Sequence, residues 1–303
     1  MEATAESVQA WRQRIGPVGV FQGGRARQFG AGLGEAAAEM EELGYGALWI
    51  GGGNPDEEAF ADLAAVLGAT RELVVAPGIA NIWAWEPAAM HASVAAIEDE
   101  HPGRFLLGLG VSHAPLVEAL GKEYRRPLAA MRDFLDRLDE AAEVAGTPPA
   151  FRVLAALRER MLELSRDRSG GAHPYFVPPQ HSAIARRILG EEPLLAPEQA
   201  VVLDTDPDRA REIARGHMSR YLTMPNYLNS LRVLGFADED FADGGSDRLV
   251  DAIVAWGTVD EVAARVREHL EAGADHVAIQ PLDAEGGLGV ESLRRLAPAL
   301  RGR

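Results

Sequence analysis

Cysteine is absent from the 303 residues of this chain, and lysine occurs only once, as Lys122. The lack of cysteine excludes disulfide bonds, a thiolate nucleophile and cysteine-based metal sites. The sequence also has no hydrophobic run long enough to span a bilayer, and its polar N-terminus lacks the apolar segment of a signal peptide. We therefore expect a cytoplasmic protein that does not enter membranes.

Basic residues are scarce, because 30 Lys and Arg stand against 46 Asp and Glu and give a formal net charge of −16. A surface of this sign repels phosphate backbones, so we expect no nucleic-acid partner. No HExxH, GxSxG or Walker pattern occurs. His173 and His181 flank an expected strand, which places them at opposite ends of it and excludes a shared metal. We expect no metal site.

Short apolar segments alternate with amphipathic ones along the chain. The expected strands are Val18–Phe21, Ala47–Ile50, Leu73–Asn81, Arg104–Gly110, Arg152–Leu157, His173–Val177, Ala200–Leu203 and His276–Gln280. Continuously apolar strands are typical of parallel sheets that are buried on both faces. Eight strand-plus-helix units predict a TIM (β/α)8 barrel of the α/β class that spans residues 1–303 as one domain. An open doubly wound sheet is the alternative.

Residues 223–257 lie outside this repeat and are expected to form a helical insertion. The insertion follows the seventh strand, so its MPNY segment (Met224–Tyr227) is a candidate cover for a substrate. Thr258 and Glu261, three residues apart, predict the first turn of the next helix.

The third expected strand contains an irregular segment, APGIAN. Pro77 is disfavoured inside a central strand, and Gly78 indicates a bulge or a close approach of backbone to a ligand. An ordinary bend at the end of a strand is the alternative. Because sites in such barrels lie at the carboxyl ends of the strands, this segment is a candidate part of the site.

The segment GLGVSHAP ends the fourth strand at the same rim. Its glycines allow close backbone approach, and Ser112 and His113 follow them. Histidine titrates near neutral pH, so His113 is a candidate for proton transfer. A purely structural histidine is the alternative.

The segment LAALRERM follows the fifth strand. Arg158 and Arg160 fall in the first turn of the next helix, where cations oppose the helix dipole. An anion held by the free N–H groups and an arginine would explain them. The alternative is a pair of solvated arginines, with Arg160 paired to Glu163.

The segment SGGAHPYF offers a second possible phosphate loop, at Gly170 and Gly171. In a barrel, these glycines lie between the fifth helix and the sixth strand, at the rim opposite the site. A helix C-cap and a tight turn are therefore the favoured interpretation.

Four segments carry a family resemblance: ELGYGALWI, VAPGIANIWAWEPAAM, HPGRFLLGLGVSHAP and VDEVAARVREHLEAGADHVAIQ. They resemble the luciferase-like monooxygenase family, and within it the branch that uses the deazaflavin coenzyme F420. The resemblance extends from about Pro17 to Leu282. It implies a barrel with insertions, usually a homodimer, in which a deazaflavin, or FMN in other members, lies across the carboxyl ends of the strands.

The resemblance also implies roles for individual residues. A cis peptide bond in a bulge of the third strand maps to Gly78–Ile79, and His113 falls where related enzymes place a residue that transfers a proton. The implied cofactor-binding residues are Gly78, Ile79, Asn81, Val111, Ser112, Ala156, Leu157, Arg158, Val177 and Pro178. The expected activity is hydride transfer between F420 and a small organic substrate.

Two departures from the family pattern define the alternatives. Many members carry Asp or His after the second strand, where this chain has Gly51–Pro55, and many have glycines in the phosphate loop, where this chain has Leu157 and Arg158. An FMN-dependent monooxygenase and a non-catalytic flavin- or deazaflavin-binding protein are the alternative functions.

Overall fold

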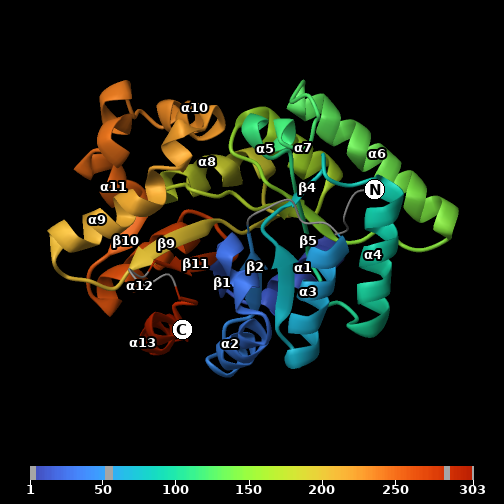
Figure 1. Ribbon diagram of the computed structural model, residues 1–303, viewed down its shortest axis with the longest axis horizontal. Helices are drawn as coiled ribbons and strands as arrows, with labels where there is room; N and C mark the ends of the chain where they lie inside the picture. Colours follow the sequence, from blue (N-terminus) through green and yellow to red (C-terminus); the bar gives the residue numbers. More distant parts are fainter. Residues whose placement is uncertain (1–4, 52–56, 283–286, 302–303) are drawn as a thin grey trace.

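The computed structural model describes residues 5–51, 57–282 and 287–301, and its strands form a central ring surrounded by helices (Figure 1). Every pairing between these strands is parallel. The strands are β1 (Val18–Gln22), β2 (Ala47–Ile50), β3 (Val74–Pro77), β4 (Ala80–Asn81), β5 (Leu107–Gly110), β6 (Arg152–Leu154), β7 (Gly171–Ala172), β8 (Leu194–Leu195), β9 (Glu198–Val202), β10 (Val254–Trp256) and β11 (Val277–Pro281).

The strand order follows a barrel. One sheet has the order β10-β9-β11-β1-β2-β3 and the other β4-β5-β6-β7-β8. They join on one side where Val75 pairs with Phe105. On the other side, Glu198 N–H donates to the Pro174 carbonyl and Ala278 N–H to the Pro197 carbonyl, each at 2.9 Å. The predicted (β/α)8 barrel is confirmed, with β3 and β4 in its third position and β8 and β9 in its seventh.

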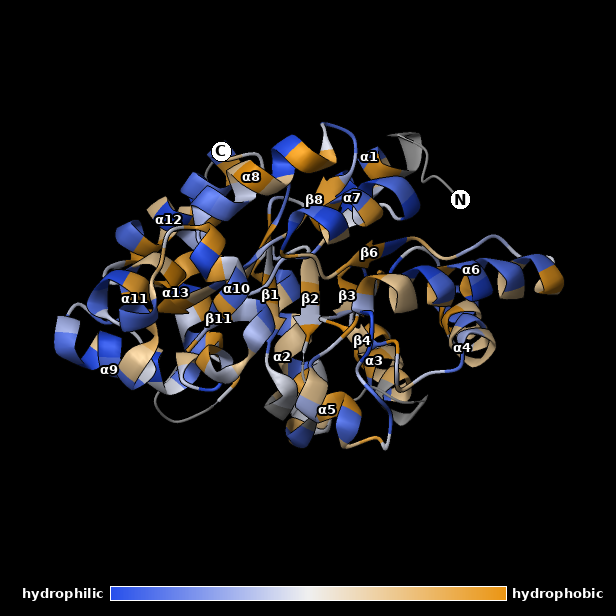
Figure 2. Cartoon of the chain, turned by 90° about the horizontal axis from the view of Figure 1, so that it is seen from above, coloured by the Kyte–Doolittle hydropathy of each residue, from blue (hydrophilic) through white to orange (hydrophobic). Residues whose placement is uncertain are grey.

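Helices surround this ring and lie at both of its ends. They are α1 (Ala5–Ile15), α2 (Ala31–Glu42), α3 (Glu57–Ala69), α4 (Pro87–Glu100), α5 (Ala114–Glu118), α6 (Pro127–Ala145), α7 (Glu159–Arg168), α8 (Pro179–Leu189), α9 (Pro207–Met218), α10 (Pro225–Val233), α11 (Asp247–Ile253), α12 (Val259–Glu271) and α13 (Val290–Arg301), with 3-10 turns η1 (Gly24–Phe29), η2 (Tyr221–Thr223) and η3 (Asp238–Gly244). Figure 2 shows that α6 and α9 carry both hydrophilic and hydrophobic residues, as expected of helices with one buried face.

The first turns of two of these helices have local causes, and the one at Thr258 confirms the prediction. Thr258 caps α12, because its N–H donates to Glu261 Oε2 at 2.7 Å while Glu261 N–H donates to Thr258 Oγ1 at 3.3 Å. Pro87 occupies the first turn of α4, where its missing N–H is not needed. Among the helices described, none is both long and apolar enough to cross a bilayer.

The sixth strand lies earlier than predicted. His173–Val177 is not a strand, and β7 is instead Gly171–Ala172. Pro174 and Pro178 cannot donate to a ladder, and Phe176 has a φ of 62°, so the chain leaves the sheet here. The prediction that His173 lies at the opposite rim from the site is therefore wrong, as is the C-cap assigned to Gly170 and Gly171, since Ser169 caps α7.

The region around the seventh strand also differs from the prediction. Residues 223–257 were expected to be helical, and they contain α10 and α11 but end in β10 (Val254–Trp256). This strand pairs with the carboxyl half of β9, from Ala200 to Val202. It was missed because VAW is short and directly continues a helical segment.

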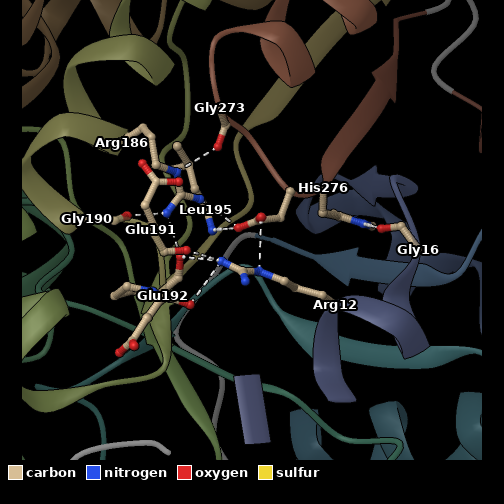
Figure 3. A network of polar contacts seen from close by, with 11 residues as sticks. Arg12, Gly16, Arg186, Gly190, Glu191, Glu192, Leu195, Gly273 and His276 are labelled. Carbon is tan, nitrogen blue, oxygen red and sulfur yellow. Dashed lines mark hydrogen bonds and ion pairs between the residues drawn. The ribbon is translucent and has the colours of Figure 1, made fainter. Parts of the chain in front are cut away.

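The rim where the strands begin is closed by α1. Trp11 stacks on Phe151 with ring centroids 5.1 Å apart. Arg12 forms an ion pair with Asp275 and donates to the carbonyl of Glu191 at 2.7 Å, which ties α1 to the segments before β8 and β11 (Figure 3). These contacts close the barrel at the amino ends of the strands, so a site can form only at their carboxyl ends.

Buried histidines and one buried glutamate give the stability of this barrel a pH dependence with a definite sign. Burial lowers the pKa of His173, His217 and His276 to about 4 and that of His269 to about 3, and raises the pKa of Glu198 to about 8. The unfolded chain binds more protons at the histidines as the pH falls below about 6.5, whereas the folded chain binds one more at Glu198 between about 4.5 and 8.

We expect the free energy of unfolding to peak near pH 7. Below that, the four histidines outweigh Glu198 and stability falls towards pH 4, with each histidine contributing up to about 1.4 kcal/mol per pH unit. Above it, loss of the Glu198 proton lowers stability more gently. Urea unfolding at pH 5, 6, 7 and 8.5 measures this. A free energy that stays constant between pH 5 and 7 would contradict it.

Candidate functional site

A cavity of about 980 Å³ opens at the carboxyl ends of the strands, where (β/α)8 barrels place their sites. Eight of the eleven residues that the sequence predicts for the site line it: Gly78, Ile79, Val111, Ser112, His113, Ala156, Leu157 and Arg158. Asn81, Val177 and Pro178 are buried behind its wall. Gly51 also lines the cavity, whereas the rest of the Gly51–Pro55 segment, which departs from the family pattern, lies outside the described residues.

The break between β3 and β4 forms part of the wall. The peptide bond between Gly78 and Ile79 is cis, as the resemblance implies. Gly78 N–H donates to the Ile50 carbonyl at 2.8 Å. A Cβ on Gly110 would lie 2.5 Å from the side chain of Ile79, so the glycine of β5 makes room for this bulge. Asn81 accepts a hydrogen bond from Trp83 N–H and thus stabilises the turn after β4 instead of facing the cavity.

His113 lies at the rim beyond β5 and is the residue that precedes α5. Its ring contacts that of Tyr227, with centroids 5.1 Å apart. Burial, with a smaller contribution from the positive charge of Arg220, lowers the pKa of His113 to about 4. At neutral pH the imidazole is therefore uncharged, with one nitrogen able to donate and the other able to accept a hydrogen bond.

Positive charge gathers at the cavity even though the chain has a net charge of −16. The residues that line it include Arg126, Arg132, Arg158, Arg160 and Arg220, and among the described lining residues only Glu159 carries a carboxylate. Within the described chain, none of these five guanidinium groups has an ion-pair or hydrogen-bond partner. The pair between Arg160 and Glu163, expected for merely solvated arginines, is not formed. The cavity is thus suited to an anionic ligand.

The loop after β6 brings two of these arginines to the cavity. Arg158 is the N-cap residue of α7, so the N-terminus of this helix points to the same place. His181 Nε2 lies 2.7 Å from the Leu157 carbonyl and donates a hydrogen bond to it. His181 belongs to α8, whose N-cap residue is Pro178. The predicted residues Val177 and Pro178 therefore support the loop from behind.

An aromatic wall covers the other side of the cavity, and the sequence analysis identified only part of it. Tyr221, Met224 and Tyr227 come from η2 and α10, so the predicted MPNY segment does reach the cavity. Tyr175 completes the wall. Its hydroxyl lies 2.9 Å from Tyr221 Oη and 2.9 Å from Gln280 Oε1. The α5, α7 and α10 helices all lie at this end of the barrel (Figure 1).

The remaining residues that sequence reasoning missed come from several kinds of element. Arg126 directly precedes α6, Arg132 lies in its second turn, and Arg220 precedes η2. Phe21 and His173 form the floor. Tyr175 lies in the middle of the expected strand His173–Val177, and the sequence did not show to which side its ring points.

Comparisons with known proteins agree with this geometry. The chain is 21% identical over 285 residues to a 5,10-methylenetetrahydromethanopterin reductase of Archaeoglobus fulgidus, covering 78% of this chain and 85% of that protein. The coenzyme F420-dependent tetrahydromethanopterin reductase from Methanopyrus kandleri superimposes with a TM-score of 0.75, at 16% identity, over 94% of this chain and 98% of that one.

A second solved structure is an F420-dependent secondary alcohol dehydrogenase in complex with an F420-acetone adduct. It superimposes with a TM-score of 0.71, at 16% identity, over 94% of this chain and 99% of that one. At this identity, the likeness establishes the fold. The profile of one family, described as luciferase-like monooxygenase, matches residues 20–276. The chain belongs to the luciferase-like monooxygenase family.

Proposed function

We propose that this protein is an oxidoreductase that uses coenzyme F420 to transfer a hydride to or from a small organic substrate. The observation that carries the proposal is the cavity itself, with the Gly78–Ile79 bulge at the base and five arginines around it that have no ion-pair or hydrogen-bond partner among the described residues. The F420 coenzyme combines a flat ring with a phosphate and an acidic tail. FMN ends at one phosphate, so the number of arginines favours the more anionic cofactor.

The two parts of F420 fit different parts of the cavity. The ring would be held against Gly78–Ile79, Val111 and Ser112, which line the cavity together. The phosphate would be held by the loop Ala156–Arg158 and the N-terminus of α7. Arg126, Arg132 and Arg160 would hold the carboxylates of the tail. When bound, F420 supplies a ring carbon that donates or accepts a hydride.

The aromatic wall is the proposed substrate side. A carbonyl that gains a hydride on its carbon must also gain a proton on its oxygen, and an alcohol that is oxidised loses both. His113 would transfer this proton, which is supported by its position in the cavity lining directly after Val111 and Ser112 and by its ring contact with Tyr227. In the oxidation direction its uncharged imidazole would accept the hydroxyl proton and become imidazolium, and in the reduction direction the imidazolium would return that proton to the substrate oxygen. Tyr227, Tyr221 and Met224 exclude water from the reacting groups.

Titration with oxidised F420, followed by its fluorescence, tests the proposal. We expect saturable binding to one site per chain, weakened by salt because the arginines contribute to it. Mass spectrometry of the protein with its copurified cofactor, and assays with alcohols, aldehydes and enones, complete the test. Tight binding of FMN with oxygen consumption, and none of F420, would favour the monooxygenase alternative. Binding of F420 without turnover of any substrate class would favour a non-catalytic binding protein.

A further inference from the structure

His173 lies on the floor of the cavity and has no role in the chemistry proposed so far. It follows β7, and its N–H donates to the Leu154 carbonyl at 2.9 Å. The side chain is 1% exposed. Its ring stacks on that of Trp49 with centroids 4.1 Å apart and planes 6° apart, and it also lies 5.9 Å from the ring of Phe21. The imidazole is therefore held in one orientation.

The hydrogen bonds of His173 define its tautomer. Nδ1 lies 2.7 Å from the carbonyl oxygen of Ala196. A carbonyl only accepts hydrogen bonds, so Nδ1 carries the hydrogen and Nε2 presents a lone pair. Burial lowers the pKa of His173 to about 4, so the ring remains uncharged and Nε2 remains an acceptor at neutral pH.

This acceptor is buried and has no partner among the described residues. The Nε1–H of the neighbouring Trp49 does not donate to His173 Nε2, because it donates to His276 Nε2 at 3.2 Å. A buried acceptor without a donor is costly, so one that is retained beside a cavity indicates a ligand that supplies the donor.

The Nε2 atom of His173 is directed at the base of the cofactor site. His173 lines the cavity together with Gly78 and Ile79. A Cβ built on Gly78 would lie 3.5 Å from His173 Nε2, so the acceptor is next to the residue that begins the cis peptide bond. A group bound against this bulge lies within reach of the imidazole.

We infer that His173 accepts, through Nε2, a hydrogen bond from an N–H or O–H group of the ring bound against Gly78–Ile79. This inference rests on the proposed function, under which that ring is the deazaflavin of F420. A deazaflavin carries both kinds of donor, an N–H in its pyrimidine part and a phenolic O–H. His173 is then a binding and orienting residue for the ring, separate from the arginines that hold the phosphate and tail.

The test uses two probes and three variants. The probes are F420 and its tail-less analogue 8-hydroxy-5-deazariboflavin, which has the ring but neither phosphate nor acidic tail. His173→Phe keeps a flat ring on Trp49 but removes the acceptor. His173→Gln places an amide oxygen near the position of Nε2. His217→Phe is the matched control, because the Nε2 atom of this half-buried histidine is also buried without a partner among the described residues, while His217 does not line the cavity.

We expect His173→Phe to raise the Kd of both probes by about tenfold, the effect of a buried hydrogen bond lost to a neutral donor. The absorption maximum of the bound probe should shift, and His173→Gln should restore part of the affinity. His217→Phe should bind both probes as the wild-type protein does. Circular dichroism of every variant establishes that it is folded.

Three results would overturn the inference. In the first, His173→Phe is folded and binds both probes with the wild-type Kd and spectrum. In the second, the variant loses affinity for F420 but not for the tail-less probe, which would place the effect at the tail. In the third, the wild-type protein binds neither probe, and the proposed function then fails with the inference. The first two leave the proposed function intact.

Discussion

Replacing His113 with alanine lowers turnover by about 100- to 1000-fold and leaves the Kd of F420 within about threefold of wild type. The magnitude is that of losing a positioned proton donor and acceptor at the reacting oxygen. The side chain lies at the rim, against Tyr227, and not at the base near Gly78–Ile79. Steady-state turnover together with fluorescence titration of the cofactor separates the two effects.

Two further measurements test whether His113 acts in the chemistry. Added imidazole should restore part of the turnover of His113→Ala by entering the space that the side chain left. His101→Ala is the matched control, because His101 caps the far end of α4 and does not line the cavity. It should retain wild-type turnover. If His113→Ala also retains it, the assignment of the proton to this residue is wrong.

The double change Arg158→Ala with Arg160→Ala should raise the Kd of F420 by about 100-fold, because each removes a charge-assisted contact to the phosphate or tail. Affinity for the tail-less deazaflavin should not change. The remaining affinity for F420 should also depend less on salt, since fewer charges are neutralised on binding. Isothermal titration at two ionic strengths measures both effects.

Arg187→Ala controls for loss of positive charge in general. Arg187 is exposed on α8 and does not line the cavity, so its removal should leave the Kd of F420 unchanged. If the Kd of F420 is unchanged in the variant that lacks Arg158 and Arg160, these residues are solvated surface arginines and do not bind the cofactor. The positive charge at the cavity would then have to be explained by Arg126, Arg132 and Arg220.

The barrel was predictable from the sequence because its strands are buried on both faces and therefore read as continuous apolar runs. The bulge at Gly78–Ile79 was predictable for a local reason, since Pro77 and Gly78 interrupt such a run. The early end of the sixth strand was not predictable from the sequence. HPYFV has the composition of a strand, but Pro174 has no N–H to donate and Phe176 has a positive φ, so the segment cannot continue the parallel hydrogen-bond ladder.

The site was predictable only where it follows a strand. His113 and Arg158 come directly after β5 and β6, so strand order alone brings them to one rim. Strand order does not predict the positions of Arg126, Arg132 and Arg220, because they do not directly follow a strand. Their sequence context is that of ordinary surface helices. Only the folded chain shows that their side chains converge. Likewise, the acceptor on His173 could not be recognised without its contacts to Ala196 and Trp49.

The pairing of β10 with β9 divides the residues of the cavity into two groups that can vary independently, one on the proposed substrate side and one on the proposed cofactor side. The segment that carries Tyr221, Met224 and Tyr227 leaves the barrel after β9 and returns to it at β10, so both of its ends are fixed in the same sheet. The proposed cofactor contacts come from earlier in the chain, between Gly78 and His173. An exchange of residues 219–253 between relatives could therefore alter which substrate is accepted while the cofactor side is retained. This makes the segment a natural unit for the divergence of substrate preference and for its redesign.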